Sequence, residues 1–203
     1  MRVQTSVGPA EVAFDATPDP RFLLVMTHGA SGGVDTADLV AVRDAAVEIG
    51  GAVARVLQPF RVAGARAPGS AAKQDAAWVE LVTKLRRKVP GVPLIQGGRS
   101  NGARVACRTA HESGADGVLC LSFPLHPPGK PEASRAEELR APLPHGIPLH
   151  VVQGEADPFG TPGEVRAELP DPAMVTAAKG AHAFAKNPTD VLEAVRAFLG
   201  GLA

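Results

Sequence analysis

A serine stands between two glycines in the segment Gly98-Arg99-Ser100-Asn101-Gly102, and Ala103 follows it. A strand that turns sharply into a helix tolerates only very small residues two before, two after and three after such a serine. Gly98, Gly102 and Ala103 meet that requirement. The turn lifts the hydroxyl above the start of a helix whose free N–H groups face it. The spacing predicts that Ser100 is a nucleophile, and the competing interpretation is a glycine-rich turn with a surface serine.

A serine hydroxyl attacks only when a base removes its proton. The chain has six histidines, and one of them, His182, lies in Lys179-Gly180-Ala181-His182-Ala183-Phe184, after the last predicted strand. A base placed there can return to the serine in a fold of alternating strands and helices. The sequence therefore predicts His182 as the general base, with an ordinary surface-loop histidine as the alternative.

The base in turn needs a carboxylate that holds its tautomer and stabilises the imidazolium. The loop after the preceding predicted strand, Gly154-Glu155-Ala156-Asp157-Pro158-Phe159-Gly160, offers two acids. We choose Asp157, because Glu155 lies closer to the strand and is expected to point elsewhere. An aspartate before proline is also typical of a simple turn. The chain order serine, aspartate, histidine differs from the two well-known protease orders.

Attack on a carbonyl group also requires two hydrogen-bond donors for the oxyanion. One expected donor is the backbone N–H of Asn101, which directly follows the serine. The second is expected from the loop His28-Gly29-Ala30-Ser31-Gly32-Gly33, where we choose the N–H of Ala30. We interpret His28 as a structural residue of this turn. A phosphate-binding loop is the weaker interpretation, because the GxGxxG spacing and the Gly-Lys-Ser/Thr ending are both missing.

Three basic residues, Arg66, His126 and Lys130, lie in loops that follow predicted strands. We expect these loops to overhang the edge at which the serine lies. There the three side chains would recognise a carboxylate or another anionic group of a substrate. The alternative, a rigid proline-stiffened loop with solvated charges, stays open.

The candidate residues need elements that bring distant loops to one edge of the molecule. The chain opens with a hairpin, Val3–Val7 and Glu11–Phe14 around Gly8-Pro9, and then alternates between strand and helix patterns. The patterns after the hairpin predict strands over 22–27, 52–57, 92–96, 117–121, 149–153 and 173–177, and helices over 35–49, 71–88, 101–111, 162–169 and 189–202.

Such alternation predicts an α/β fold, with a mostly parallel eight-stranded sheet covered by helices on both faces. Ligands bind beyond the carboxyl ends of the strands in this architecture, which is where the candidate residues lie. The length fits a single domain over 1–203. Only roughly two dozen residues separate the sixth and seventh strands, so we expect a minimal lid and an open, shallow site.

The composition excludes several classes of protein. Lys plus Arg and Asp plus Glu number 21 each, and a net charge of zero argues against nucleic-acid and anionic-membrane binding. The longest apolar run, Phe22–Met26, is too short to cross a bilayer, and no signal peptide is apparent, so a cytoplasmic location is expected. Cys107 and Cys120 lack metal-ligand spacing and are expected to be buried thiols.

Five segments resemble the alpha/beta-hydrolase superfamily over essentially the whole chain. Within it they are similar to a branch of dienelactone-hydrolase-like proteins that includes testis-expressed and NSL-complex-subunit relatives. Asn101 departs from this branch, which more often has Met, but the backbone N–H is retained. The segments are THGASGG (27–33), GGRSNGARVA (97–106), LCLSFPLHPPGKPE (119–132), QGEADPFGTP (153–162) and KGAHAF (179–184).

The resemblance implies an alpha/beta-hydrolase fold and a hydrolase, without fixing a reaction. Epoxide hydrolases and dehalogenases of this fold place an acid at the position of Ser100, and dienelactone hydrolase proper usually places Cys there. We therefore expect a serine hydrolase that cleaves a small ester, lactone or thioester, with no metal or organic cofactor. The alternative is a non-catalytic interaction module that belongs to a larger assembly. A small-molecule substrate is the expected partner, and monomer and homodimer stay equally open.

Overall fold

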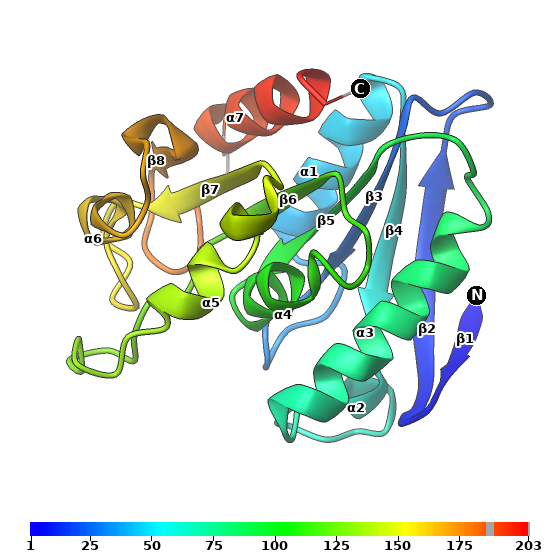
Figure 1. Ribbon diagram of the computed structural model, residues 1–203, viewed down its shortest axis with the longest axis horizontal. Coiled ribbons are helices and arrows are strands. Elements are labelled where there is room, and N and C mark those ends of the chain that lie inside the picture. The colour runs from blue at the N-terminus through cyan, green and yellow to red at the C-terminus, as the bar shows by residue number, and fades with distance from the viewer. Residues whose placement is uncertain (186–188, 203) are drawn as a thin grey trace.

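The computed structural model of the chain describes residues 1–185 and 189–202 (Figure 1). Its strands are β1 (Arg2–Thr5), β2 (Gly8–Ala16), β3 (Phe22–Thr27), β4 (Gly51–Leu57), β5 (Leu94–Arg99), β6 (Gly117–Leu121), β7 (Leu149–Gly154) and β8 (Val175–Ala178). They form one sheet in the order β1-β2-β4-β3-β5-β6-β7-β8. β2 pairs antiparallel with β1 and with β4, and every pair from β4 to β8 is parallel. The predicted mostly parallel eight-stranded sheet is confirmed.

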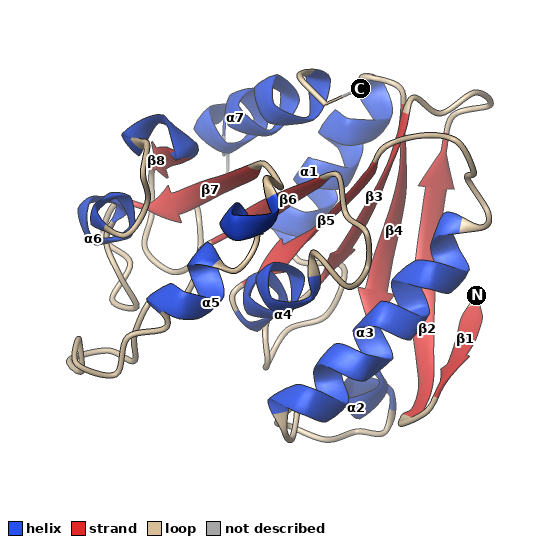
Figure 2. Cartoon of the chain, in the orientation of Figure 1, coloured by secondary structure: helices blue, strands red, loops and turns tan. Residues whose placement is uncertain are grey.

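Helices cover both faces of this sheet. In Figure 2, α3, α4 and α5 lie in front of the sheet and α1 lies behind it. None of the helices in the described ranges has the length and apolar character needed to span a membrane. The helices are α1 (Ala37–Glu48), α2 (Pro59–Val62), α3 (Ala71–Arg86), α4 (Asn101–Thr109), α5 (Ala136–Arg140), α6 (Pro162–Ala167) and α7 (Thr189–Gly200), with short 3-10 turns over Leu143–His145 and Pro172–Met174.

The central strand β3 explains why both faces must be covered. All six of its residues are buried, and successive side chains of a strand point to opposite faces. Leu23 and Val25 pack in one core cluster with Trp78 of α3. Leu24 and Met26 pack in another cluster, with side chains of α1 and α7. A strand that is apolar on both faces therefore buries each face under its own layer of helices.

The opening hairpin turns two residues earlier than predicted. Thr5 pairs with Gly8, so the turn consists of Ser6 and Val7, and the segment Gly8-Pro9 belongs to β2. The Thr5 hydroxyl donates a hydrogen bond to the carbonyl of Gly8 at 2.6 Å. Gly8 adopts a φ of +121°, a backbone conformation that glycine takes without steric cost. The glycine thus begins the second strand instead of forming the turn.

Two further predictions of element boundaries were wrong. The segment 58–69, for which the sequence patterns predict neither strand nor helix, contains the four-residue helix α2, which has Pro59 as its first residue. Four residues are too few to show a helical period. β5 covers Leu94–Arg99 instead of 92–96, because Gly97 and the residues after it still pair with the neighbouring strands. Gly97 itself lies so close to the carbonyl of Leu119 on β6 that a side chain would have no room. This glycine permits close strand packing and does not end the strand.

A buried glutamine joins three elements in the middle of the core. Gln96 of β5 has no exposed surface. Its Oε1 accepts a hydrogen bond from Trp78 Nε1 of α3 at 3.1 Å. Its Nε2 donates to the carbonyl of Ala106 at 2.6 Å and to the hydroxyl of Thr109 at 3.1 Å, both on α4. The position of α4, which begins beside Ser100, is therefore fixed by polar contacts as well as by apolar packing.

We expect Gln96→Leu to lower the free energy of unfolding by about 1–3 kcal/mol, because the buried indole N–H of Trp78 loses its acceptor. Urea unfolding followed by circular dichroism measures the change. In a Trp78→Phe background the same substitution should cost less, since no indole N–H is left unpaired. Equal costs in the two backgrounds would contradict the assigned role of the pair.

Candidate active site

Ser100 occupies a strained turn between β5 and α4. Its backbone has φ 53° and ψ −114°, outside the regions that residues with a side chain normally adopt. The backbone N–H of Ser100 donates to the carbonyl of Leu121 on β6 at 2.9 Å. The carbonyl of Ser100 accepts a hydrogen bond from the backbone N–H of Arg104, in the first turn of α4, at 3.2 Å. Contacts on both sides of the residue therefore hold the turn in this conformation.

The two glycines that flank the serine are required by close backbone contacts. A Cβ atom on Gly98 would lie 2.6 Å from the carbonyl oxygen of Thr27, and one on Gly102 would lie 2.6 Å from the same oxygen. Real Cβ atoms do not approach an oxygen this closely. The structure thus gives a physical reason for the small residues from which the turn was predicted.

The structure brings Ser100, His182 and Asp157 together in one hydrogen-bonded series. The Ser100 hydroxyl lies 3.0 Å from Nε2 of His182. Nδ1 of the same imidazole lies 2.9 Å from Oδ2 and 3.1 Å from Oδ1 of Asp157. A carboxylate only accepts hydrogen bonds, so Nδ1 carries the proton and Nε2 is free to accept one from serine. The Asp157 side chain is fully buried, whereas that of His182 is 22% exposed.

Asp157 is held by donors other than the histidine. Nε2 of Gln153 donates to Oδ2 at 3.1 Å, and the backbone N–H of Phe159 donates to Oδ1 at 2.9 Å. The same Gln153 nitrogen lies 2.7 Å from the carbonyl of Gly160, which fixes the loop around the acid. Sequence reasoning missed Gln153. A polar residue inside an otherwise apolar strand, four positions before the acid, is the signal that identifies it.

Two neighbours shape the loop that carries the histidine. The ring of Phe159 packs against the imidazole of His182 with centroids 4.4 Å apart. At the end of β7, the α-carbon of Gly154 faces the carbonyl of Ala181 so closely that no side chain fits between them. The acid loop and the histidine loop are therefore in direct contact.

The predicted oxyanion donors lie on segments adjacent to the serine. A Cβ atom on Gly29 would lie 3.4 Å from the Cβ of Ser100, so the loop after β3 approaches the serine at that residue. Ala30 follows in a turn closed by the N–H of Gly32 and the carbonyl of Gly29 at 3.1 Å. Asn101 is the first residue of α4, and its N–H has no acceptor inside the helix.

His28 is buried at the base of this loop. Its Nδ1 donates to the carbonyl of Gly29 at 2.7 Å, and its Nε2 accepts from the backbone N–H of Gln58 at 3.1 Å. An acceptor at Nε2 requires the neutral ring. Burial lowers the pKa of His28, the hydrogen bond to Gly29 opposes this effect, and the charge of Arg61 lowers the pKa further. His28 therefore links the predicted oxyanion loop, residues 28–33, to the end of β4 as a neutral residue.

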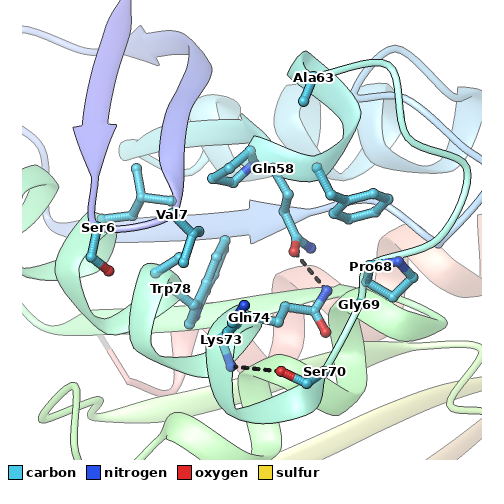
Figure 3. A pocket seen from close by; sticks show the side chains of 14 residues that line it. Ser6, Val7, Gln58, Ala63, Pro68, Gly69, Ser70, Lys73, Gln74 and Trp78 are labelled. Atoms are coloured by element: carbon cyan, nitrogen blue, oxygen red, sulfur yellow. Dashed lines mark hydrogen bonds between the residues drawn. The ribbon is translucent and has the colours of Figure 1, made fainter.

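A pocket of about 430 Å³ lies between α2, α3 and the turn of the opening hairpin (Figure 3). Gln58 and Gln74 point toward each other in it, and Gln74 Nε2 donates to Gln58 Oε1 at 2.7 Å. Phe60, which also lines the pocket, packs against the ring of His28 with centroids 5.7 Å apart. Ser100 is not among the residues that line it.

The three basic residues predicted as substrate contacts have different surroundings. His126 is buried and places Nε2 3.3 Å from a carboxylate oxygen of Glu164 on α6. Arg66 and Lys130 are exposed, and over residues 1–185 and 189–202 their side chains form no hydrogen bond or ion pair. The structure does not join any of the three to the serine, histidine and aspartate by a hydrogen bond.

The two cysteines are buried, as expected from the sequence, and their sulfur atoms lie 3.4 Å apart as free thiols. Burial raises the pKa of Cys107 well above its ordinary value, and the contact with Cys120 acts in the same direction. No group of three or more potential metal-ligating side chains occurs in the described part of the chain.

Comparison with known proteins places this geometry in context. Residues 20–194 match the family described as "Alpha/beta hydrolase domain". A serine hydrolase without a lid from Xanthomonas campestris is 20% identical, with a TM-score of 0.76 over 99% of this chain and 93% of that one. Est1E from Butyrivibrio proteoclasticus, solved with ferulic acid bound, is 15% identical, with a TM-score of 0.78 over 100% and 98%.

A serine hydrolase homologue from Coxiella burnetii is 16% identical to the chain, with a TM-score of 0.77 over 100% of this chain and 96% of that one. No curated protein matches the chain at a significant level. At these identities the structural likenesses show a shared fold.

We expect acid to destabilise the protein partly through His28. In the folded state its pKa lies below 6.5, the ordinary value that it has in the unfolded chain. As the pH falls through 6.5, the unfolded chain binds a proton at His28 and the folded protein does not, so the free energy of unfolding decreases. Between about pH 8 and pH 5, His28→Gln should therefore lose less stability than the wild type in urea unfolding. His150, whose pKa is also lowered by burial, is present in both proteins and cancels in the comparison. Identical pH dependence in the two proteins would show that His28 is not held neutral.

Proposed function

Because the chain belongs to the alpha/beta hydrolase domain family, we propose that it is a serine hydrolase that cleaves a small ester, lactone or thioester through an acyl-enzyme. Its fold is the alpha/beta-hydrolase fold. The observation that carries the proposal is the hydrogen-bonded series from the Ser100 hydroxyl through His182 to Asp157. We also propose, from the five sequence segments quoted above, that the chain belongs to the dienelactone-hydrolase-like branch.

In the first step, Ser100 Oγ attacks the carbonyl carbon of the substrate while its proton passes to Nε2 of His182. Asp157 stabilises the imidazolium that forms and keeps Nδ1 protonated. The negative oxygen of the tetrahedral intermediate accepts hydrogen bonds from the N–H groups of Ala30 and Asn101. When the intermediate collapses, the bond from the carbonyl carbon to the leaving oxygen or sulfur breaks, and that atom takes the proton from Nε2. The alcohol or thiol of an ester or thioester departs, whereas the hydroxyl of an opened lactone stays attached to the acyl group.

In the second step, water attacks the acyl-enzyme and transfers a proton to the same Nε2 of His182. The resulting intermediate collapses, the bond to Ser100 Oγ breaks, and the serine regains its proton. The products are the carboxylic acid and the restored enzyme. The reaction needs no metal and no organic cofactor, because the proton stays between serine, imidazole, leaving group and water.

Several features support small or flexible substrates. Residues 122–148, between β6 and β7, contain only the five-residue helix α5 and a 3-10 turn, so this connection forms no large lid. The first neighbour is described as lidless, and the carboxylic acid bound to Est1E is the type of product that ester hydrolysis releases. Arg66 and Lys130 stay candidates for an anionic substrate group because both are exposed, whereas His126 is engaged by Glu164.

Substituting either end of the proton pathway should abolish the activity. We expect Ser100→Ala and His182→Ala each to lower turnover of a short-chain nitrophenyl ester by a factor on the order of 10⁶, the cost seen in a well-studied serine triad. Ester hydrolysis and labelling by a fluorophosphonate probe measure the effect. The wild type should label at Ser100 and Ser100→Ala should not.

Failure of the wild type to label, or equal labelling of Ser100→Ala, would refute the catalytic proposal. It would favour the alternative of a non-catalytic interaction module. If the wild type labels and Ser100→Ala does not, a panel of acyl esters of different chain length, with Ser100→Ala as the blank, defines the acyl preference of the enzyme.

The acid is distinguished from its neighbour by a matched pair of variants. We expect Asp157→Asn to lower turnover by about 10⁴, because an amide favours the wrong tautomer of the histidine. Glu155→Gln changes the exposed acid two residues earlier in the same loop and should retain wild-type turnover. The nitrophenyl ester assay compares the two. A larger loss in Glu155→Gln than in Asp157→Asn would reverse the assignment.

A further inference from the structure

Arg99 connects three segments of the proposed active site. It lies between Gly98 and Ser100 in the strained turn. Its Nε lies 2.7 Å from Oδ2 of Asp38 in the first turn of α1. One of its terminal nitrogens donates to the backbone carbonyl of His182 at 2.7 Å. A single guanidinium therefore joins the serine turn, the start of α1 and the histidine loop.

The carboxylate of Asp38 is a fixed partner for this guanidinium. Asp38 is 8% exposed, and its Oδ1 accepts the backbone N–H of Leu39 at 2.9 Å, which leaves Oδ2 for Arg99. The Arg99 side chain is 18% exposed. A planar guanidinium whose Nε is fixed in this way also has its terminal nitrogens fixed in direction.

The oxyanion loop lies against the same guanidinium. A Cβ atom on Gly29 would lie 3.4 Å from the other terminal nitrogen of Arg99. The loop that carries the proposed donor Ala30 and the loop that carries His182 are thus both in contact with one side chain. Movement of that side chain would disturb both loops.

The backbone of His182 depends on Arg99 more than the rest of its loop does. The base of the loop is closed by the N–H of Ala185 to the carbonyl of Lys179 at 2.9 Å and by the N–H of Ala181 to the carbonyl of Ala183 at 3.1 Å. Within the described ranges, the bond from Arg99 is the one hydrogen bond to the His182 main chain.

We propose that Arg99 is a positioning residue, which uses its ion pair with Asp38 to hold the His182 backbone so that the imidazole reaches Ser100. The inference rests on the proposed hydrolase function. Loss of the contact lets the loop tip move, and a misplacement of about 1 Å at a catalytic group can cost a factor of about 10² in rate. The substrate does not contact Arg99 in this role, so the loss falls on kcat.

The chain offers a matched ion pair as a control. Arg104, five residues later, forms a bidentate pair with Glu138 of α5, with both N···O distances 2.7 Å. The guanidinium and carboxylate of that pair join α4 to α5 and contact none of the three proposed catalytic residues. The backbone N–H of Arg104, which donates to the carbonyl of Ser100, is retained when the side chain is replaced by alanine. Arg104→Ala therefore measures what the loss of a comparable arginine ion pair does to folding alone.

The first experiment compares Arg99→Ala with Arg104→Ala in ester hydrolysis. We expect kcat of Arg99→Ala to fall by about 10² with little change in KM, while Arg104→Ala retains kcat near wild type. Arg99 and Asp38 also line a cavity of about 240 Å³, which would admit a small cation. Guanidinium, at concentrations well below those that unfold the protein, should restore part of kcat in Arg99→Ala, and sodium at equal ionic strength should not.

Normal kcat in folded Arg99→Ala, or an equal loss in Arg104→Ala, would overturn the proposal. If Arg99→Ala does not fold, the variant Asp38→Asn tests the positioning role of Arg99 instead. This variant keeps an acceptor for the N–H of Leu39 but removes the charge that fixes Arg99, so kcat should fall with KM unchanged. Unchanged kcat in folded Asp38→Asn would also overturn the proposal.

Failure of the proposed function is recognised separately, because the wild type would then neither label with fluorophosphonate nor hydrolyse the ester. Hydrogen exchange would still test the positioning role. The hydrogen-bonded amides of Ala181 and Ala185, which close the loop, should exchange faster in Arg99→Ala than in Arg104→Ala, measured against a reference segment in β3. Equal exchange rates in the two variants would refute the role of Arg99 whether or not the protein is a hydrolase.

Discussion

The end of β3 lies directly against the turn that carries Ser100, and this contact determines the position of that turn relative to the loop 28–33, which follows β3. The carbonyl oxygen of Thr27 occupies the space that a Cβ atom on Gly98 or Gly102 would need. A methyl group at either position would force β3 and the serine turn apart. The predicted oxyanion loop continues from Thr27, so such a shift would also carry its proposed donor Ala30 away from Ser100. One steric contact thus sets the position of Ser100 relative to that loop.

The strained backbone of Ser100 is a consequence of the same packing. A residue held in a sparsely populated conformation costs about 1–3 kcal/mol, which the surrounding structure must offset. The bond from the Ser100 N–H to Leu121 and the start of α4 provide contacts that only this conformation makes. The buried hydrogen bonds of Gln96 then fix α4 to β5 and α3, so the helix cannot turn away to relieve the strain. The core and the site therefore share one set of constraints.

Residues whose type is set by the nearby backbone, or which directly follow a strand, were predictable from the sequence. Small residues around Ser100 reflect contacts that any sharp strand-to-helix turn makes, and Asp157 and His182 follow strands whose apolar runs are plain. Contacts set by packing between distant elements were not predictable. Gln153 supports Asp157 through a side chain whose direction depends on the register of β7 in the sheet, where Gln153 pairs with Ala177 of β8.

The same limit applies to the basic residues. Arg99 stands beside the serine in the sequence, yet its partners lie 61 and 83 positions away, at Asp38 and His182. His126 was expected to face the substrate edge, but α6 brings Glu164 to it. Long charged side chains reach whichever opposite charge the fold places nearby, and sequence spacing carries little information about that choice.

The polar groups that build the site fall into two chemical kinds. Amide side chains hold the acid and the residue from which the predicted oxyanion loop starts: Gln153 Nε2 donates to Asp157, and Gln58 Nε2 donates to the hydroxyl of Thr27. The Gln58 amide also accepts a hydrogen bond from Gln74, so it satisfies two buried partners without the desolvation cost of a charge. The histidine loop is different, because its contact with Arg99 includes a full charge balanced by Asp38. A charged contact that is partly exposed weakens in salt, whereas buried amide contacts do so far less. The position of the histidine is therefore the part of the site geometry that should respond most to ionic conditions.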